Sequence, residues 1–194
     1  MKLIIITGAP ASGKSSIAEN VGKKLNIDVI SKDAFKIELF EKYGFTSHAE
    51  KKKLSILGEK MMYESIAKSV DLDRDLIVDN NFKNFEEVRK IIAGANHPVD
   101  NKCIYCVADY SLLAKRYNER ISSGNRHLAL YTLNQYPVVD GVSEFHPMIT
   151  KDDVHRIEQG IQEFTFGQDI LEVNTDRIET EFELICNRVI EFVR

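Results

Sequence analysis

Residues 8–15 read GAPASGKS and follow the pattern G-x-x-x-x-G-K-S, which is typical of a P-loop that binds nucleotide phosphates. Gly8 and Gly13 permit a close approach of the backbone to a ligand that a Cβ atom would hinder. Successive N–H groups of such a loop point at phosphate oxygens, and the helix that follows adds its positive N-terminal end. We expect Lys14 to reach the β- and γ-phosphates and the Ser15 hydroxyl to coordinate Mg²⁺.

The chain lacks the further motifs that a GTPase would normally carry. Neither D-x-x-G nor N-K-x-D occurs, since Asn101 and Lys102 are followed by Cys103 and Ile104. We therefore expect a nucleotide-binding protein other than a GTPase. The residues of the loop that we expect to line its site are Gly8, Ala9, Pro10, Ala11, Ser12, Gly13, Lys14, Ser15 and Ser16.

Asp79 ends the apolar run LIVD at residues 76–79, which is the position of a Walker B aspartate. Such a carboxylate holds Mg²⁺ through water or orients a substrate. A hydrolase often has a second carboxylate beside it to polarise water, but Asn80 and Asn81 follow here and neither is a base. The alternative is a polar residue that merely ends a strand.

Asp33 lies in the stretch ISKDAFKIELF, residues 30–40, between an apolar run that ends at Ile30 and a helical pattern that includes Phe35. Its carboxylate is a good N-cap, so Asp33 can simply begin the helix. It also lies just past the carboxyl end of an expected strand, where open α/β sheets bind ligands. An ionised carboxylate there can accept the proton of a hydroxyl that attacks the γ-phosphate. The two roles do not exclude each other.

Three arginines follow the fourth expected strand. Arg116 and Arg120 are four residues apart, hence on one helical face, and Arg126 comes shortly after them. Guanidinium groups stabilise the charge that develops during phosphoryl transfer, so these residues are candidates for closing over ATP. The alternative, from spacing alone, is an ordinary solvated helix face.

Strand and helix patterns alternate along the chain. Strands are expected at residues 3–7, 27–31, 76–80, 102–108 and 169–173, and further helices at 14–25, 50–70, 84–93, from 109 to beyond 120, and at 176–192. Asn84 and Asp109 are expected to cap two of the helices, and Asp176 with Glu179 resembles a capping box. Strands separated by helices predict an α/β fold, with a parallel sheet covered by helices on both faces.

One segment breaks this alternation. Residues 122–150 contain Gly124, Pro137, Gly141 and Pro147 without a steady hydrophobic period. A long irregular segment in a compact domain is often a lid or a binding loop, although a harmless insertion is the alternative. With 194 residues, we expect a single domain, 1–194, that carries a lid or insertion at about 115–150.

Composition excludes several classes of protein. The net charge of −4 and the pI near 5.8 argue against a general nucleic-acid binder. The sequence has no transmembrane run, and its N-terminal apolar stretch is too short for a signal peptide, so we expect a cytoplasmic protein without membrane attachment.

Cys103 and Cys106 form a C-x-x-C within an expected strand. Because residues three apart on a strand point to opposite faces, we interpret them as two buried residues.

The stretches GAPASGKS, ISKDAFKIELF, LIVDNNF and RYNERISSGNRH, in this order, resemble the predicted-kinase family of P-loop ATPases. Zeta toxins, chloramphenicol phosphotransferase and polynucleotide kinase are its relatives. The resemblance covers nearly the whole chain and implies a nucleoside-monophosphate-kinase-like P-loop NTPase fold with a five-stranded parallel sheet in the order 2-3-1-4-5.

The same resemblance implies roles for individual residues. It implies that Asp33 faces the acceptor hydroxyl. It implies that a lid arginine contacts the ATP phosphates, with Arg126 as the best match and Arg116 or Arg120 as rivals. The loop after the fifth strand would pack near adenine, which places Asn174 and Thr175 there.

We therefore expect an ATP- and Mg²⁺-dependent kinase that phosphorylates a hydroxyl group of a small molecule. A 5′-hydroxyl polynucleotide kinase is the nearest alternative, but it would need a basic groove for the phosphate backbone. A nucleotide-binding switch or toxin component that acts through a protein partner is an alternative of another class.

Overall fold

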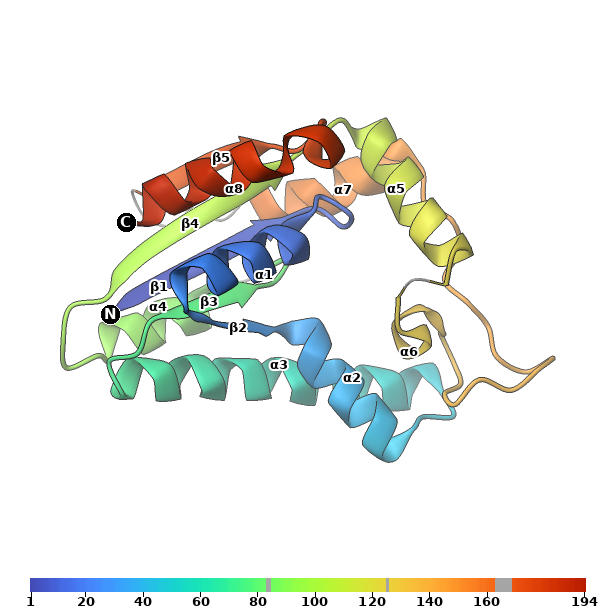
Figure 1. The fold of residues 1–194 in the computed structure, drawn as a ribbon. Coiled ribbons are helices and arrows are strands. Elements are labelled where there is room, and N and C mark those ends of the chain that lie inside the picture. Colours follow the sequence, from blue (N-terminus) through green and yellow to red (C-terminus); the bar gives the residue numbers. More distant parts are fainter. Residues whose placement is uncertain (83–84, 125, 163–168) are drawn as a thin grey trace.

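The computed structural model describes residues 1–82, 85–124, 126–162 and 169–194. Figure 1 shows a twisted sheet between two layers of helices, with further helices and loops beyond the carboxyl ends of the strands. The strands are β1 (Lys2–Gly8), β2 (Asp28–Ser31), β3 (Leu76–Asp79), β4 (Asp100–Val107) and β5 (Ile170–Asn174). The helices are α1 (Lys14–Leu25), α2 (Lys32–Tyr43), α3 (His48–Asp71), α4 (Glu86–Ala93), α5 (Tyr110–Ser122), α6 (Leu128–Tyr131), α7 (Lys151–Gln162) and α8 (Ile178–Val193).

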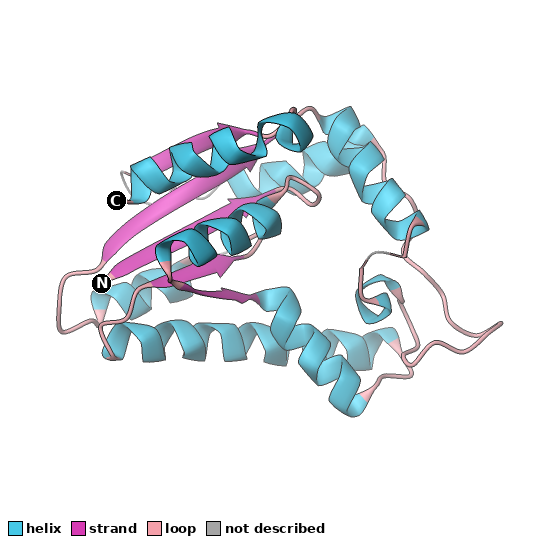
Figure 2. Ribbon diagram, in the orientation of Figure 1, coloured by secondary structure: helices cyan, strands magenta, loops and turns pink. Residues whose placement is uncertain are grey.

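The five strands form one parallel sheet in the order β2-β3-β1-β4-β5, which confirms the expected fold class and strand order (Figure 2). The register pairs Ile6 of β1 with Asp79 of β3, and Asp79 with Ser31 of β2. The carboxyl ends of these three strands therefore lie side by side. The P-loop follows β1, so the sheet itself brings the loop, Asp79 and the start of α2 to one edge.

The core lies on both faces of β1. Ile4 and Ile6 pack against α1 and α8, while Leu3 and Ile5 pack against α3 and α4, all four residues being fully buried. This explains why β1 is apolar throughout, since a central parallel strand has no solvent face.

The two cysteines of the C-x-x-C motif lie on opposite faces of β4. Cys103 packs in the layer of α3 and α4, and Cys106 in the layer of α1 and α8. Both thiols are free and buried. The interpretation of this motif as two separate core residues is confirmed.

Gly22 sets the distance between α1 and β2. A Cβ atom at this position would lie 2.4 Å from Val29 Cγ2 and 2.9 Å from the Ile27 carbonyl oxygen. We expect Gly22→Ala to lower the free energy of unfolding by about 1–3 kcal/mol through overpacking, although alanine is the better helix former. Urea unfolding measures this difference. The matched control is Gly160→Ala in α7, where a Cβ meets no atom within 4 Å and we expect no loss of stability; an equal loss at both positions would contradict the packing argument.

Helix starts differ from the expectations at two places. The N-cap of α2 is Ser31, whose Oγ accepts a hydrogen bond from the Ala34 N–H at 3.1 Å, so a capping role for Asp33 is wrong. Helix α8 begins at Ile178 without a side-chain cap. The predicted capping box at Asp176 is therefore wrong as well, because its carboxylate accepts the Asp109 backbone N–H at 2.8 Å instead.

Other local expectations had different outcomes. Asp109 caps α5 as expected, since its Oδ1 accepts hydrogen bonds from the N–H groups of Ser111 and Leu112. The predicted cap at Asn84 lies outside the described residues. Helices α6 and α7 were not expected. In the described part of the chain, no helix has the length and apolar character needed to cross a lipid bilayer.

The irregular segment is fastened to the rest of the fold by backbone contacts. Phe45, just after α2, forms an antiparallel bridge with Tyr136, and each donates its N–H to the other's carbonyl at 2.8 Å. Within the segment, Thr132 bridges to Phe145. That residues 115–150 act as a lid stays a prediction.

Candidate active site

The P-loop adopts the conformation that its glycines allow. Gly8 and Gly13 have φ angles of 141° and 82°, which L side chains rarely adopt. A Cβ at Gly8 would also lie 2.3 Å from the Cys106 carbonyl oxygen. The Lys14 ammonium donates hydrogen bonds to the carbonyl oxygen of Ala9 at 2.7 Å and to Ser12 Oγ at 3.4 Å. Lys14 thus crosses the mouth of the loop, in reach of ligands that the loop would bind.

Ser15 and Asp79 meet at the base of this loop. The Ser15 hydroxyl donates to Asp79 Oδ2 at 2.5 Å. Burial raises the pKa of Asp79, against the opposing effects of Lys14 and the Ser15 hydrogen bond. One hydroxyl and one carboxylate form the kind of oxygen set with which proteins hold Mg²⁺ together with substrate phosphates. The described residues include no cluster of three or more His, Cys, Asp or Glu arranged for a metal.

A cavity of about 240 Å³ opens at the carboxyl edge of the sheet. The P-loop, the start of α2, the end of β3 and the α5–α6 region surround it. Its lining residues are Pro10, Ala11, Lys14, Ser15, Ser31, Asp33, Lys36, Asp79, Asn80, Asn81, Tyr117, Arg120, Arg126 and Leu130. The structure therefore brings eight of the predicted site residues into one cavity, namely Pro10, Ala11, Lys14, Ser15, Asp33, Asp79, Arg120 and Arg126.

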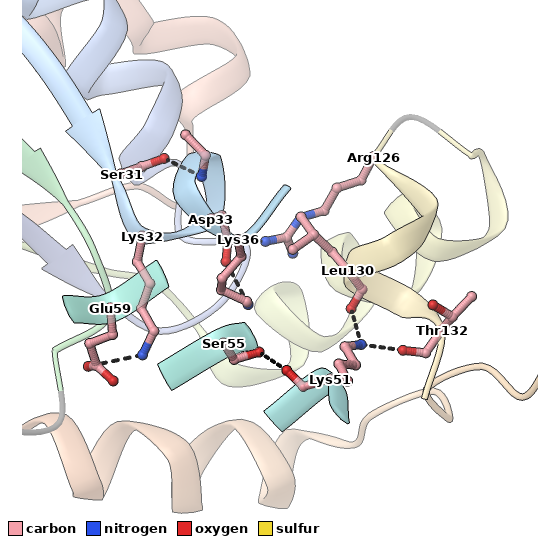
Figure 3. A network of polar contacts seen from close by, with 11 residues as sticks. Ser31, Lys32, Asp33, Lys36, Lys51, Ser55, Glu59, Arg126, Leu130 and Thr132 are labelled. Atoms are coloured by element: carbon pink, nitrogen blue, oxygen red, sulfur yellow. Dashed lines mark hydrogen bonds and ion pairs between the residues drawn. The ribbon is translucent and has the colours of Figure 1, made fainter. Parts of the chain in front are cut away.

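Asp33 lies in the first turn of α2 and points into this cavity. Its Oδ1 accepts a hydrogen bond from the Lys36 ammonium at 3.0 Å, and its Oδ2 is paired with Nη2 of Arg126. Figure 3 shows the three side chains converging from α2 and from the segment before α6. Burial alone would raise the pKa of Asp33, but Lys36 and Arg126 together hold it below its usual range. The carboxylate is therefore ionised at neutral pH and available to accept a proton.

Residues 3–135, most of the chain, match the model of a protein family that is described as an AAA domain. The chain belongs to this AAA domain family. The expected resemblance to P-loop kinases is confirmed by the solved structures that this AAA domain is similar to. No curated protein is significantly similar to it in sequence.

Three solved structures illustrate the similarity. A candidate kinase from Chloroflexus aurantiacus J-10-fl is 25% identical over 100% of this chain and 98% of that chain, with a TM-score of 0.77. A gluconokinase from Sinorhizobium meliloti 1021 is 15% identical over 98% and 94% of the two chains, with a TM-score of 0.55. The shikimate kinase from Bacteroides thetaiotaomicron is 17% identical over 97% and 96%, with a TM-score of 0.54. The fold of this AAA domain is thus that of small-molecule kinases.

Arg116 lies away from the cavity and fastens the loop after β5. Its guanidinium donates to the carbonyl oxygens of Thr175 and Asp176, both at 3.0 Å, and lies 3.3 Å from Glu179 Oε1. Arg120, one turn further along α5, lines both the cavity and a second hollow on the outer side of the P-loop. Arg116 also borders this outer hollow, so both helix arginines of this AAA domain lie beside the P-loop, and Arg120 is the one of the two in the described cavity lining.

Asn174 and Thr175 make internal contacts. The amide of Asn174 accepts the Asp176 N–H at 2.8 Å, and the Thr175 hydroxyl donates to the Val107 carbonyl at 3.1 Å. Their predicted contact with adenine stays a prediction. Ile178, three residues after Thr175, borders the outer hollow beside the P-loop.

Two lysines in and beside the cavity were not predicted from the sequence. Lys36 is three residues after Asp33 and therefore on the same helical face, a signal that could have found it. Lys51, near the start of α3, is only 8% exposed. Its ammonium donates to the carbonyl oxygens of Thr132 and, at 3.4 Å, of Leu130, so it anchors the segment that carries Arg126 (Figure 3). Burial, reinforced by Lys36, lowers the pKa of Lys51 to about 8.

We expect Arg126→Ala to lower kcat of this AAA domain by roughly 10²-fold or more, as loss of a charge contact in the transition state does. The affinity for ATP should change less, because the P-loop is untouched. Steady-state kinetics and calorimetry measure the two quantities. If Arg126→Ala turns over normally while Arg120→Ala or Arg116→Ala is inactive, the arginine that contacts the ATP phosphates is the one whose loss abolishes activity, and not Arg126.

Proposed function

We propose that the protein is an ATP- and Mg²⁺-dependent kinase that transfers the γ-phosphate to a hydroxyl group of a small molecule. The observation that carries this proposal is the presence of a P-loop lysine and an ionised carboxylate, Lys14 and Asp33, in one cavity of about 240 Å³. The family and the kinases that share the fold support it.

Each residue has a defined part in the proposed reaction. The P-loop N–H groups and Lys14 hold the β- and γ-phosphates. Ser15 and Asp79 would hold Mg²⁺, which neutralises phosphate charge when it is bound. Arg126, helped by Arg120, would stabilise the charge on the transferred group.

Asp33 accepts the proton of the acceptor hydroxyl as that oxygen attacks the γ-phosphorus. The bond between the γ-phosphorus and the β–γ bridging oxygen breaks, and ADP leaves. Both carboxylate oxygens already accept one cation each. An ionised carboxylate has about four lone-pair sites, so a hydroxyl can still approach.

The test is a screen of hydroxylated metabolites with ATP labelled in its γ-phosphate, scored for labelled product. We expect a product that forms only with Mg²⁺ and only with the right class of acceptor. An oligonucleotide with a free 5′-hydroxyl belongs in the same screen, because labelling of it would favour a polynucleotide kinase. ATP binding without transfer to any acceptor would instead favour a nucleotide-binding switch.

A further inference from the structure

The acceptor end of the cavity carries more positive than negative charge. Asp33 is the carboxylate at this end, and it faces two cations, Lys36 and Arg126. The other acid of the described cavity lining, Asp79, lies at the phosphate end, bound to Ser15. One carboxylate therefore faces two cations. When Arg126 binds the transferred phosphate, as proposed above, Lys36 is the cation left to face the acceptor.

The surroundings do not offset this surplus. Lys51 lies behind α2 and donates to backbone carbonyls. Among the described residues, no carboxylate forms an ion pair with it. Burial together with Lys51 and Lys36 lowers the pKa of His146 to about 4, so this histidine is neutral at physiological pH and adds no charge of its own. Burial is the main cause of both lowered pKa values, and the charge of Lys36 contributes to each.

The Lys36 side chain is held in place. Its stem lies against Gly58 of α3, where a Cβ atom would come 3.1 Å from Lys36 Cγ. The side chain is 19% exposed. A cation fixed in this way loses little conformational freedom when it binds a ligand, and this favours its use in recognition.

We propose, on the basis of the kinase function proposed above, that the acceptor carries an anionic oxygen group, a carboxylate or a phosphate, which Lys36 binds beside Asp33. The ammonium of Lys36 has three donors and spends one on Asp33. A charge-assisted hydrogen bond to the acceptor would use another. The amides of Asn80 and Asn81 and the Tyr117 hydroxyl line the same cavity and suit the remaining polar groups of such a molecule.

The first test compares matched sets of acceptors in the transfer assay: a neutral polyol, the carboxylate of the same carbon skeleton, and its phosphate monoester. We expect kcat/KM for an anionic member to exceed that for the neutral member by about tenfold or more, and the preferred anion identifies which of the two groups is recognised. Lys36→Gln should remove most of this preference, mainly by raising KM. Lys32→Gln is the matched control, because Lys32 is on the same helix, pairs with Glu59 at 3.0 Å and is not part of the described cavity lining.

The two proposals fail in different ways. Efficient transfer to neutral acceptors, with no preference for anions, would overturn the anionic acceptor and leave the kinase standing. Absence of transfer to every acceptor, with ATP bound, would overturn the kinase.

A second measurement tests the anion site without transfer. With the P-loop filled by Mg²⁺ and a non-hydrolysable ATP analogue, inorganic phosphate and acetate are titrated by calorimetry. We expect binding of at least one that Lys36→Gln weakens about tenfold and Lys32→Gln does not. Binding that is absent, or equal in both variants, would overturn the anion site.

Discussion

Replacement of Asp33 by asparagine is expected to slow phosphate transfer by about 10²- to 10⁴-fold, the usual contribution of a general base. Asparagine has nearly the same shape but cannot accept the proton of the attacking hydroxyl. The start of α2 is not disturbed, because Ser31 provides its cap. The affinity for ATP should stay near that of the unchanged protein, since the P-loop keeps all its contacts. Single-turnover transfer rates and calorimetry with the ATP analogue measure the two effects.

The control for Asp33→Asn is Ser31→Ala, which removes the cap and should lower the free energy of unfolding by about 1 kcal/mol. Comparison of the two unfolding curves separates a catalytic loss from a structural one. Because Lys36 and Arg126 hold the pKa of Asp33 below its usual range, protonation of Asp33 should not slow the free enzyme above about pH 5. Transfer by Asp33→Asn at nearly the original rate would place the base elsewhere, with Asp79 as the next candidate.

Replacement of Lys14 by alanine is expected to weaken ATP binding by about 10- to 10²-fold, the value of a hydrogen bond to a charged group, and to remove most of the activity. The fold should remain, because the Lys14 ammonium is costly to bury: burial lowers its pKa and its hydrogen bonds are to oxygens of its own loop. Calorimetry and thermal unfolding measure the two outcomes.

Lys24→Ala is a matched control for Lys14→Ala, since Lys24 is on the same helix, at the far end from the P-loop, and pairs with Glu183. It should leave both ATP affinity and activity unchanged. Unchanged ATP affinity in Lys14→Ala would overturn the assignment of the P-loop as the nucleotide site.

The sheet and its functional edge could be predicted because the signals for them are local. The apolar run before Gly8 could only be a strand buried on both faces, and the glycine pattern fixed the loop after it. Asp33 and Asp79 each follow an apolar run, so a parallel sheet had to bring both to the edge that holds the P-loop.

The remaining features depend on competition or on distant contacts. Ser31 and Asp33 are both good caps, and Ser31 provides the cap because α2 begins immediately after β2. Asp176 had the spacing of a capping box, but the Asp109 N–H competes for its carboxylate. Lys51 donates to the carbonyl oxygens of Leu130 and Thr132, which lie 79 and 81 positions further along the chain. No periodic pattern in the sequence relates partners that are so far apart.

The burial of Cys103 and Cys106 on opposite faces of β4 makes thiol chemistry a measure of how the sheet opens. Burial raises the pKa of both thiols to about 12, so the reactive thiolate is scarce. An alkylating reagent reaches each thiol only when the helical layer that covers it separates from the sheet. A ligand that binds the closed form alone slows such opening in proportion to its occupancy. Modification of Cys106, whose carbonyl lies beside Gly8, therefore reports on the layer under the P-loop, while modification of Cys103 reports on the layer opposite.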